Sequence, residues 1–568
     1  MTFRKLIPAH QVHYYLLEIM VLAPFFIFST SFDPAFDTPK RLAFLAIATL
    51  ATCFLWALSK ISLPQHFIKF ALFYGLSGIL SSLFSDRPMT GFATTGVMIG
   101  AFLILLAIEN FSSQAKERLP LFLFLTALTQ CLFALLQLVH IQWLPEIVNP
   151  QNSHPMIGTL GNSEFLSSLL GVGFFMGLHV YQKHQNRSHR IYVGIGLSLI
   201  AGTLLLTKSK GSVLFILLCI GSRFLTRRTF SYLCVSSAGL IPIFLWIFPS
   251  SIKGRLLLWL AGLKSMESDW SLGVGPGSGG NAYLPAVHDL FQSHPTLIKG
   301  FGSFAAKVSD FHNLFLQWGV EQGIMGVALA LGLFSYLFGL ALRTRTFLGL
   351  ALLFLLFKSL YTVLLTSITG LVLFVITCAL VLPHKKTVVL SAKNRMIFII
   401  PMGLFVFGII VLGGQRDQAL GMKNLAHGNL MEAHANFTKV IRLNPEYGPA
   451  HLSMAFIHSI MGEPHLMESS IERAVRLDKS IDCLKKSAHM YYTNGQWDRA
   501  FPLYKTLAET YPEHLTPRIQ LAEIELKRGQ PAKAKPYAWD VLHIEPRVKS
   551  DTYPRNKARA REILELLP

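Results

Sequence analysis

The chain contains a series of long apolar segments, and this feature limits its possible folds more than any other. Lipid offers the backbone no hydrogen-bond partners, so a membrane-spanning chain must form helices or a closed barrel. A helix crosses the hydrocarbon core with about twenty apolar residues. This length predicts about 12–13 spans, near residues 12–30, 41–59, 66–84, 91–110, 119–141, 163–182, 191–207, 211–225, 229–249, 313–341, 347–364, 367–383 and 396–414.

The composition supports an integral membrane protein with an all-α, polytopic bundle. Hydrophobic residues make up 52% of the chain and charged residues 14%, and the mean hydropathy is +0.45. The net charge of +20 comes from cations at span ends rather than from a stripe of basic and aromatic residues, so nucleic acid is not an expected partner. Most of the six cysteines lie in apolar segments, which favours neither a disulfide framework nor a metal cluster.

The distribution of Lys and Arg between the short loops predicts the orientation in the membrane. One set of alternate loops holds most of these residues, and the positive-inside rule places that set in the cytoplasm. The opposite set contains only Lys40, Arg41, Arg87, Lys208 and Lys210. We therefore expect the long loop and, with an odd number of spans, the C-terminal tail on the outer face of the membrane. If 347–364 and 367–383 formed one broken helix, the tail would instead lie in the cytoplasm.

The tail has an internal period that the membrane domain, residues 1–414, lacks. Its glycines Gly428, Gly462, Gly495 and Gly529 are 34, 33 and 34 residues apart. Each is followed five residues later by one of Ala433, Met467, Ala500 and Ala534. This is the pattern of tetratricopeptide repeats, helix pairs that stack into a solenoid and bind proteins. We predict repeats over 415–547 and a C-terminal helical extension over 548–568; a non-repeating helical bundle is the alternative.

A polar loop from about residue 250 to 311 interrupts the spans and ends directly before His312. Long loops between spans are usually functional. Because imidazole titrates near neutrality, His312 could act as a general base toward a hydroxyl, with Asp310 or Asn313 orienting the ring. The alternative is that His312 only caps or anchors the helix entrance.

Cationic residues on the predicted outer face are candidates for binding a lipid diphosphate. Arg255 and Trp259 are four residues apart and share a helical face, and a guanidinium can hold a diphosphate with two parallel hydrogen bonds. Lys208 and Lys210 form a second cationic pair. Equally, Arg255 and Trp259 fit an interfacial anchor, and the two lysines fit side chains that extend to water from a span end.

Asn162 and Glu164 lie where another span begins. Asn162 fits a helix cap, whereas a carboxylate at a membrane boundary is costly unless it is solvated or paired. The segment 275–280 (GPGSGG) matches a dinucleotide-binding pattern but has no surrounding strand-turn-helix unit, so we interpret it as a flexible loop. No Walker loop or metal-binding motif is found, which favours chemistry without metal or cofactor.

Four segments, in this order, resemble the motifs of the O-antigen ligase superfamily, which includes O-antigen polymerases and bacterial O-oligosaccharyltransferases. They are 158–166 (GTLGNSEFL), 207–211 (TKSKG), 255–259 (RLLLW) with 272–277 (LGVGPG), and 312–323 (HNLFLQWGVEQG). Several members of this superfamily carry tetratricopeptide tails. The chain departs from the family pattern at Ser163, Glu164 and Phe315, and Lys210 stands where the family has Arg, so the fork geometry is lost there.

The resemblance implies transfer of a glycan from an undecaprenyl-diphosphate carrier to an acceptor hydroxyl at the periplasmic face of the bacterial inner membrane. The acceptor would be lipid A-core, a protein or another glycan. His312 would be the general base, and Asn313 and Glu321 would support it. Arg255, Lys210 and Lys208 would stabilise the leaving diphosphate. The protein partner would bind the tail.

Two alternatives stay open at this point. One is a polysaccharide polymerase of the same fold, whose acceptor is itself lipid-linked. The other is a transporter or a non-enzymatic assembly scaffold, which ionisable residues inside spans would favour. Lys358 and Glu18 are the candidates of that kind.

Overall fold

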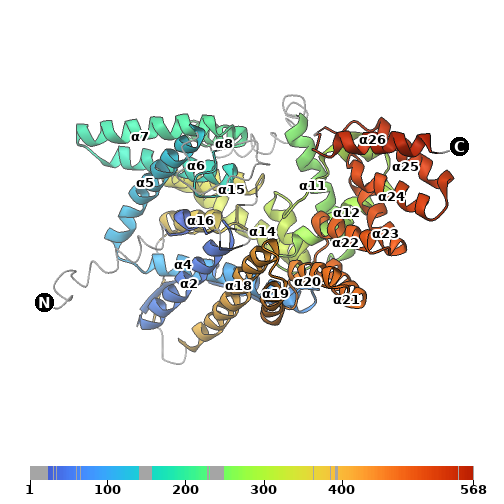
Figure 1. Cartoon of the computed structure of the whole chain (residues 1–568). Coiled ribbons are helices and arrows are strands. Elements are labelled where there is room, and N and C mark those ends of the chain that lie inside the picture. Colours follow the sequence, from blue (N-terminus) through green and yellow to red (C-terminus); the bar gives the residue numbers. More distant parts are fainter. Residues whose placement is uncertain are drawn as a thin grey trace.

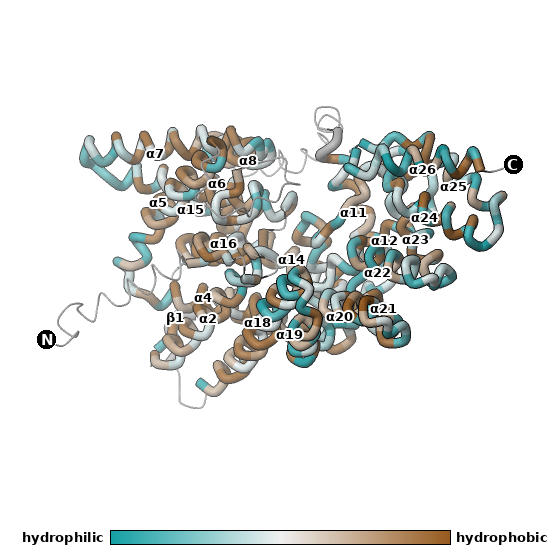
Figure 2. The backbone as a smooth tube through the Cα atoms, viewed as in Figure 1, coloured by the Kyte–Doolittle hydropathy of each residue, from teal (hydrophilic) through white to brown (hydrophobic). Residues whose placement is uncertain are grey.

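The computed structural model describes residues 23–29, 31–32, 35–58, 60–63, 65–139, 156–226, 229, 249–362, 364–383, 386–389, 395–547 and 549–566. Within these ranges the chain is helical except for one ribbon of two short strands. Apolar helices form one half of the molecule, and the more polar loop and tail form the other (Figures 1 and 2). The predicted all-α membrane bundle with a tetratricopeptide solenoid is confirmed.

Seven described helices are long and apolar enough to cross a membrane. They are α2 (Thr38–Ala57), α4 (Pro88–Glu109), α5 (Ser113–Leu138), α6 (Ser163–Lys183), α7 (Arg187–Leu206), α14 (Leu314–Thr344) and α18 (Ile399–Ala426), which the 3-10 turn η4 (Met396–Phe398) extends. Four apolar helices have shorter apolar stretches: α3 (Gln65–Leu83), α8 (Lys210–Gly221), α15 (Phe347–Ser359) and α16 (Ile368–Val381). All coincide with predicted spans. The expected spans 12–30 and 229–249 fall largely outside the described residues.

Contacts between loops show which helix ends lie together at each of the two ends of the bundle. At one end, strand β1 (Lys60–Leu63) pairs antiparallel with β2 (Lys386–Val389). At the other end, Arg41 Nη2 donates to the carbonyl of Thr366 at 3.1 Å. Thr366 and β2, which flank α16, therefore lie at opposite ends of α2, and α16 runs from one end to the other. Because α15 packs alongside α16, the two segments form a hairpin and not one broken helix.

The predicted polar loop is largely helical. It forms α11 (Pro249–Ser268), α12 (Gly279–Ser293), α13 (Thr296–Phe301) and the short turn η3 (Gly302–Phe304). Buried residues of α11 and α12, among them Leu257, Val287 and Phe291, share one hydrophobic cluster with residues of the tail such as Met467 and Leu507. From the sequence, only the segment around Arg255 and Trp259 was expected to be helical. The other helices were missed because their apolar faces pack against the tail, a partner that the loop's polar composition does not reveal.

The tail forms stacked helix pairs with the predicted period. Its helices are the end of α18, then α19 (Leu430–Leu443), α20 (Gly448–Met461), α21 (Pro464–Leu477), α22 (Ile481–Thr493), α23 (Trp497–Thr510), α24 (Leu515–Lys527), α25 (Pro531–His543) and α26 (Tyr553–Glu565). The four periodic glycines all adopt positive φ, between 70° and 80°, which allows the tight turn inside each pair. The residues that follow them by five positions, three alanines and Met467, are fully buried.

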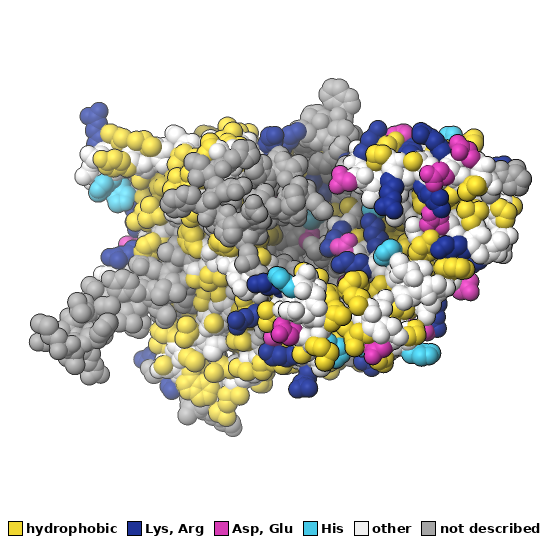
Figure 3. All heavy atoms as spheres, viewed as in Figure 1, with side chains coloured by type: hydrophobic (Ala, Val, Ile, Leu, Met, Phe, Trp, Pro, Cys, Tyr) yellow, Lys and Arg dark blue, Asp and Glu magenta, His cyan; other side chains and the backbone are white. Residues whose placement is uncertain are grey.

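The tail is joined to the membrane domain without a flexible linker. Helix α18 runs through the expected boundary at residue 414, and its last turns pack against α19 as the first repeat. Glu446 Oε2 accepts a hydrogen bond at 2.8 Å from the amide of Met89, in the first turn of α4. Charged side chains gather on the tail, while the membrane half exposes mainly apolar ones (Figure 3). Loop and tail thus occupy the same end of the bundle.

Candidate functional site

Glu164 lies at the first turn of α6, where the sequence placed a span entrance. The Asn162 side chain accepts a hydrogen bond from the amide of Glu164 at 2.7 Å and so caps the helix. The Glu164 carboxylate accepts a hydrogen bond at 3.1 Å from the hydroxyl of Ser209, which belongs to the 207–211 motif. The first two motifs therefore meet at one carboxylate.

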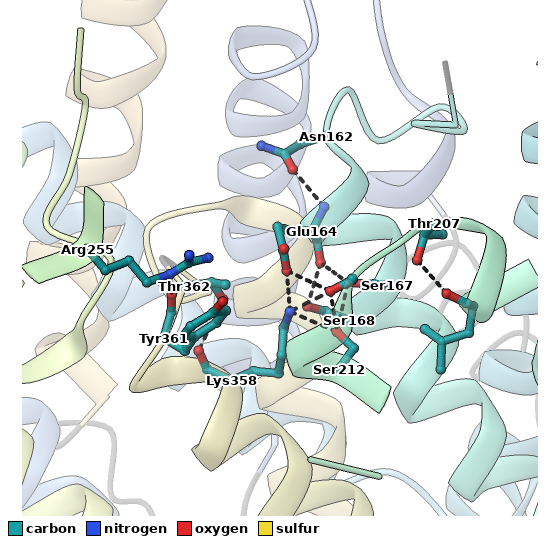
Figure 4. Close-up of polar contacts among 12 residues, drawn as sticks. Asn162, Glu164, Ser167, Ser168, Thr207, Ser212, Arg255, Lys358, Tyr361 and Thr362 are labelled. Atoms are coloured by element: carbon teal, nitrogen blue, oxygen red, sulfur yellow. Dashed lines mark hydrogen bonds and ion pairs between the residues drawn. The ribbon is translucent and has the colours of Figure 1, made fainter. Parts of the chain in front are cut away.

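Lys358, near the end of α15, is the partner of Glu164. Its ammonium lies 2.5 Å from Glu164 Oε2 and 3.0 Å from the hydroxyl of Ser212, and the side chain is fully buried (Figure 4). The sequence marked Lys358 only as an ionisable residue within an apolar run and did not assign it to the site. A buried cation requires an anion, and that requirement was the available signal. The partner, 194 positions away, was not deducible from spacing.

Arg255 reaches this cluster from α11, outside the membrane helices. Its guanidinium lies 3.5 Å from the centre of the Tyr361 ring, and its Nε donates to the Tyr361 carbonyl at 3.4 Å. Burial lowers the pKa of Arg255, and Tyr361 and the Glu164 carboxylate oppose that change. Figure 4 shows Tyr361 between Arg255 and the Glu164 and Lys358 pair. Stacking fixes the plane of the guanidinium, which suits it to a planar or bidentate anion contact.

Lys208 and Lys210 flank Ser209 at the start of α8. Both side chains are exposed. Lys208 adopts a left-handed backbone conformation with φ of 56°, which is unusual for a residue other than glycine. The structure thus places two exposed cations next to the pair formed by the half-buried Glu164 and the buried Lys358.

His312 occupies the turn immediately before α14. Its φ of 52° is left-handed, and strained backbone of this kind clusters at functional sites. The Asp310 carboxylate contacts ring atom Nδ1 of His312 and also accepts from the His312 amide at 3.2 Å. Because Asp310 takes Nδ1, the other ring nitrogen, Nε2, is the one left to act on a substrate. The His312 side chain is 40% exposed, so a substrate hydroxyl can reach it.

Asn313 connects the His312 turn to the cation cluster. Its side-chain oxygen caps α14 by accepting from the amides of Phe315 and Leu316 at 3.0 and 3.2 Å. Its Nδ2 donates at 3.1 Å to the carbonyl of Leu360, the residue before Tyr361. The structure therefore gives Asn313 the capping role and Asp310 the orienting role.

Glu321 fixes the glycine-rich segment against a break in α14. The helix is interrupted at Gln322 and Gly323, where φ is −130° and +62°. Glu321 Oε1 accepts from the amide of Gly277 at 2.9 Å and from Gln317 Nε2 at 2.7 Å, and the Glu321 carbonyl accepts from Gly275 at 3.0 Å. The interpretation of this segment as a flexible loop was wrong, because the break in α14 provides hydrogen-bond partners.

Trp259 lies one helical turn after Arg255 on α11. It packs against the hydrophobic cluster shared by the loop and the tail, and its buried Nε1 has no hydrogen-bond partner among the described residues. No group of three or more His, Cys, Asp or Glu side chains in the described part of the chain lies close enough to share a metal ion. The site as observed consists of exposed and half-buried cations, the ion pair of Glu164 and Lys358, and His312 with its Asp310 partner.

These features define a class: a multi-pass membrane protein whose last spanning helix continues into a tetratricopeptide solenoid. No protein-family model matches the chain. Over 165 residues it is 24% identical to the type IV pilus assembly protein PilF of Pseudomonas aeruginosa. That match covers 26% of this chain, and the chain spans 65% of the length of that protein.

Two solved structures show weak similarity. The structure of Pseudomonas aeruginosa pilF is 21% identical, with coverage of 27% of this chain and 74% of that chain and a TM-score of 0.22. The APC/C heterotetramer Cut9-Hcn1 is 12% identical, with coverage of 82% of this chain and 76% of that chain and a TM-score of 0.22. At these scores neither supports a conclusion about this chain.

Proposed function

We propose that the protein transfers a glycan from an undecaprenyl-diphosphate carrier to an acceptor hydroxyl at the periplasmic face of the bacterial inner membrane. One observation carries the proposal. The four segments that resemble motifs of the O-antigen ligase superfamily, separated by up to about 160 positions, meet at one end of the membrane helices. Glu164 contacts Ser209, Arg255 interacts electrostatically with Glu164, and the 312–323 segment holds the glycine loop.

The arrangement suits displacement of a diphosphate. In the reaction, the acceptor oxygen bonds to the anomeric carbon while the bond from that carbon to the phosphate oxygen breaks. Negative charge grows on the departing diphosphate, and preorganised cations lower the energy of that state. Arg255, Lys208 and Lys210 would supply the positive charge. His312 would take the proton of the acceptor hydroxyl.

The Glu164 and Lys358 pair has a positioning role in this mechanism. Glu164 neutralises the buried Lys358 and holds Ser209, the residue between the two exposed lysines. A buried, paired cation of this kind is a structural element of the site, and its pairing gives no support to a transport path through the bundle. The tail, as a tetratricopeptide array, would recruit a protein partner.

Mass analysis of lipid A, surface polysaccharide and periplasmic proteins from a strain that lacks this protein tests the proposal and names the acceptor. We expect one of the three classes to lose its glycan. Loss from lipid A or protein identifies a ligase, whereas shortened polysaccharide chains identify a polymerase. Restoration of the missing glycan by His312→Ala, or no loss from any class, would contradict the proposal.

A further inference from the structure

A cavity of about 490 Å³ lies between the glycine-rich segment, the turn that joins α3 to α4, the ends of α11 and α12 that face it, and the tail. Its volume is within the range of small-molecule sites, roughly 300–1,000 Å³. It is separate from the cation cluster around Glu164 and was not anticipated from the sequence. Helices α11, α12 and α21, which contribute residues to its lining, are seen on the same side of the molecule in Figure 1.

The wall that the tail contributes is fixed by hydrogen bonds and an ion pair. Asn281 Nδ2 donates to the carbonyl of Leu477 at 2.7 Å. Lys479, in the turn after α21, lies 3.6 Å from the Asp86 carboxylate of the α3–α4 turn. The cavity is therefore a feature of the assembled membrane and tail domains, and it would not exist in either domain alone.

Two buried polar atoms at the cavity lack hydrogen-bond partners among the described residues. They are Oγ of Ser278, whose side chain lines the cavity and is only 4% exposed, and Nε of Arg87. Buried polar atoms in folded proteins are almost always paired. Both atoms are covered in this conformation, so Ser278 Oγ would pair with a hydroxyl-bearing ligand once its side chain turns toward the cavity.

Residues on either side of the glycines Gly275 and Gly277, namely Val274 and Ser278, line this cavity. Gly275 and Gly277 have φ of +98° and +76°, and a Cβ on them would lie 2.5 Å from Ser85 Oγ and 2.4 Å from Thr94 Oγ1, respectively. The segment therefore packs directly against the membrane helices, with Ser278 following it. Through Glu321 and Gln317 the same segment is hydrogen-bonded to the amide of Phe311, next to His312.

The charges on the lining indicate the chemistry of the ligand. The cavity has four acidic residues, Asp86, Glu267, Asp269 and Asp289, and four basic ones, Arg87, Lys264, Arg476 and Lys479. A balanced set of this kind does not favour a polyanion such as a diphosphate. It offers many donors and acceptors to a neutral ligand rich in hydroxyl groups.

We propose that this cavity binds sugar residues of the substrate glycan and that the tail forms one wall of that sugar site. This inference rests on the proposed function, because the bound sugars are taken to be part of a substrate of glycan transfer. The sugars belong either to the donor, next to its diphosphate, or to a glycan acceptor. Both have the same chemistry, and the test separates them.

The test uses the full-length protein with a photoreactive benzophenone side chain in place of Ala282, which lines the cavity. The control carries it at Ala532, an exposed position on α25. After irradiation of intact cells, we expect a sugar-containing adduct at position 282 and none at 532. The adduct is then treated with mild acid. If the acid releases a polyprenyl phosphate from the adduct, the bound sugar belongs to the donor. If the adduct still carries lipid A or a peptide attached to the sugar, the sugar belongs to the acceptor. An adduct without sugar, or none, overturns the proposal.

A second measurement uses Ala282→Trp, which fills the cavity, and Ala532→Trp as the matched control. We expect Ala282→Trp to raise the KM for donor or acceptor at least about tenfold with a smaller change in kcat. If Ala282→Trp has the same KM as the parent protein for both donor and acceptor, the sugar site is refuted and the transferase proposal stays intact. A sugar adduct at position 282 in a protein without transfer activity would refute the transferase and leave the sugar site intact.

Discussion

Replacement of Glu164 by Gln should destabilise the membrane domain markedly, because it leaves Lys358 without a counter-charge. The Lys358 side chain is fully buried, and Glu164 Oε2 is its partner at 2.5 Å. Removal of one member of a buried pair costs about 3–5 kcal/mol. Since the Glu164 side chain is 31% exposed, water can reach part of the pair, and we expect a loss near the lower limit, about 3 kcal/mol.

The double variant Glu164→Gln, Lys358→Met should recover most of this loss. The hydroxyls around Lys358 keep partners when the ammonium is gone, because Ser212 donates to Ser167 at 3.0 Å and lies 2.9 Å from Ser209. No charge is then left buried. The coupling free energy between the two positions should therefore be at least about 2 kcal/mol.

Denaturant unfolding of the purified protein in detergent micelles measures these free energies. Glu117→Gln is the control, because Glu117 forms an exposed ion pair with Lys183 at 3.4 Å, and such pairs contribute little. If the effects of the two single changes at 164 and 358 add to within about 0.5 kcal/mol, the two residues do not stabilise each other. The assignment of Lys358 as a positioning residue should then be withdrawn.

Three further predictions concern the cations, the tail and pH. Arg255→Lys should slow transfer about ten- to a hundredfold, because an ammonium loses the planar fork, whereas Lys210→Arg should keep or raise the rate; equal rates for Arg255→Lys and the parent would exclude the fork. Truncation after Arg416 should abolish transfer, although the protein should still insert into the membrane. The truncation removes Glu446, which caps α4, and the wall of the cavity that the tail forms; full transfer by the truncated protein would contradict this. Burial and two neighbouring cations lower the pKa of His514 to about 4. Below about pH 6.5 the unfolded chain then binds a proton that the folded chain does not. Stability should fall by about 2 kcal/mol between pH 7 and pH 5, and His514→Gln should remove that loss; an unchanged pH profile would contradict it.

The membrane spans and the repeats were predictable because their signals are local. Spans such as 91–110 and 163–182 can be predicted from their own apolar residues, because lipid solvates them and no distant segment of the chain is required. The periodic glycines, Gly428 to Gly529, report a turn conformation that each repeat needs by itself. Asn162 and Asn313 were readable as caps for the same reason, because a cap acts within its own helix.

The remainder depends on contacts between distant segments. Nothing near Lys358 in the sequence identifies Glu164, 194 positions away, as its partner, because the two meet only when α6 and α15 pack. Apart from the segment around Arg255, the helices of the long loop were not expected, because their apolar faces pack against the tail, which is distant in the sequence. Glu446, which caps α4 from the tail, lies more than three hundred positions from that helix. Such pairs require the assembled fold.

The central claim is that His312 is the general base of glycan transfer. The most direct measurement is the transfer rate of purified His312→Ala with undecaprenyl-diphosphate glycan and the acceptor, beside the parent and a control, His294→Ala, at an exposed position in the same loop. Loss of a general base lowers the rate by about a hundred- to ten-thousandfold, and we expect a loss in that range for His312→Ala with normal accumulation in the membrane. Transfer by His312→Ala within about threefold of the parent would show that His312 is only a helix-entrance residue and would contradict the catalytic assignment.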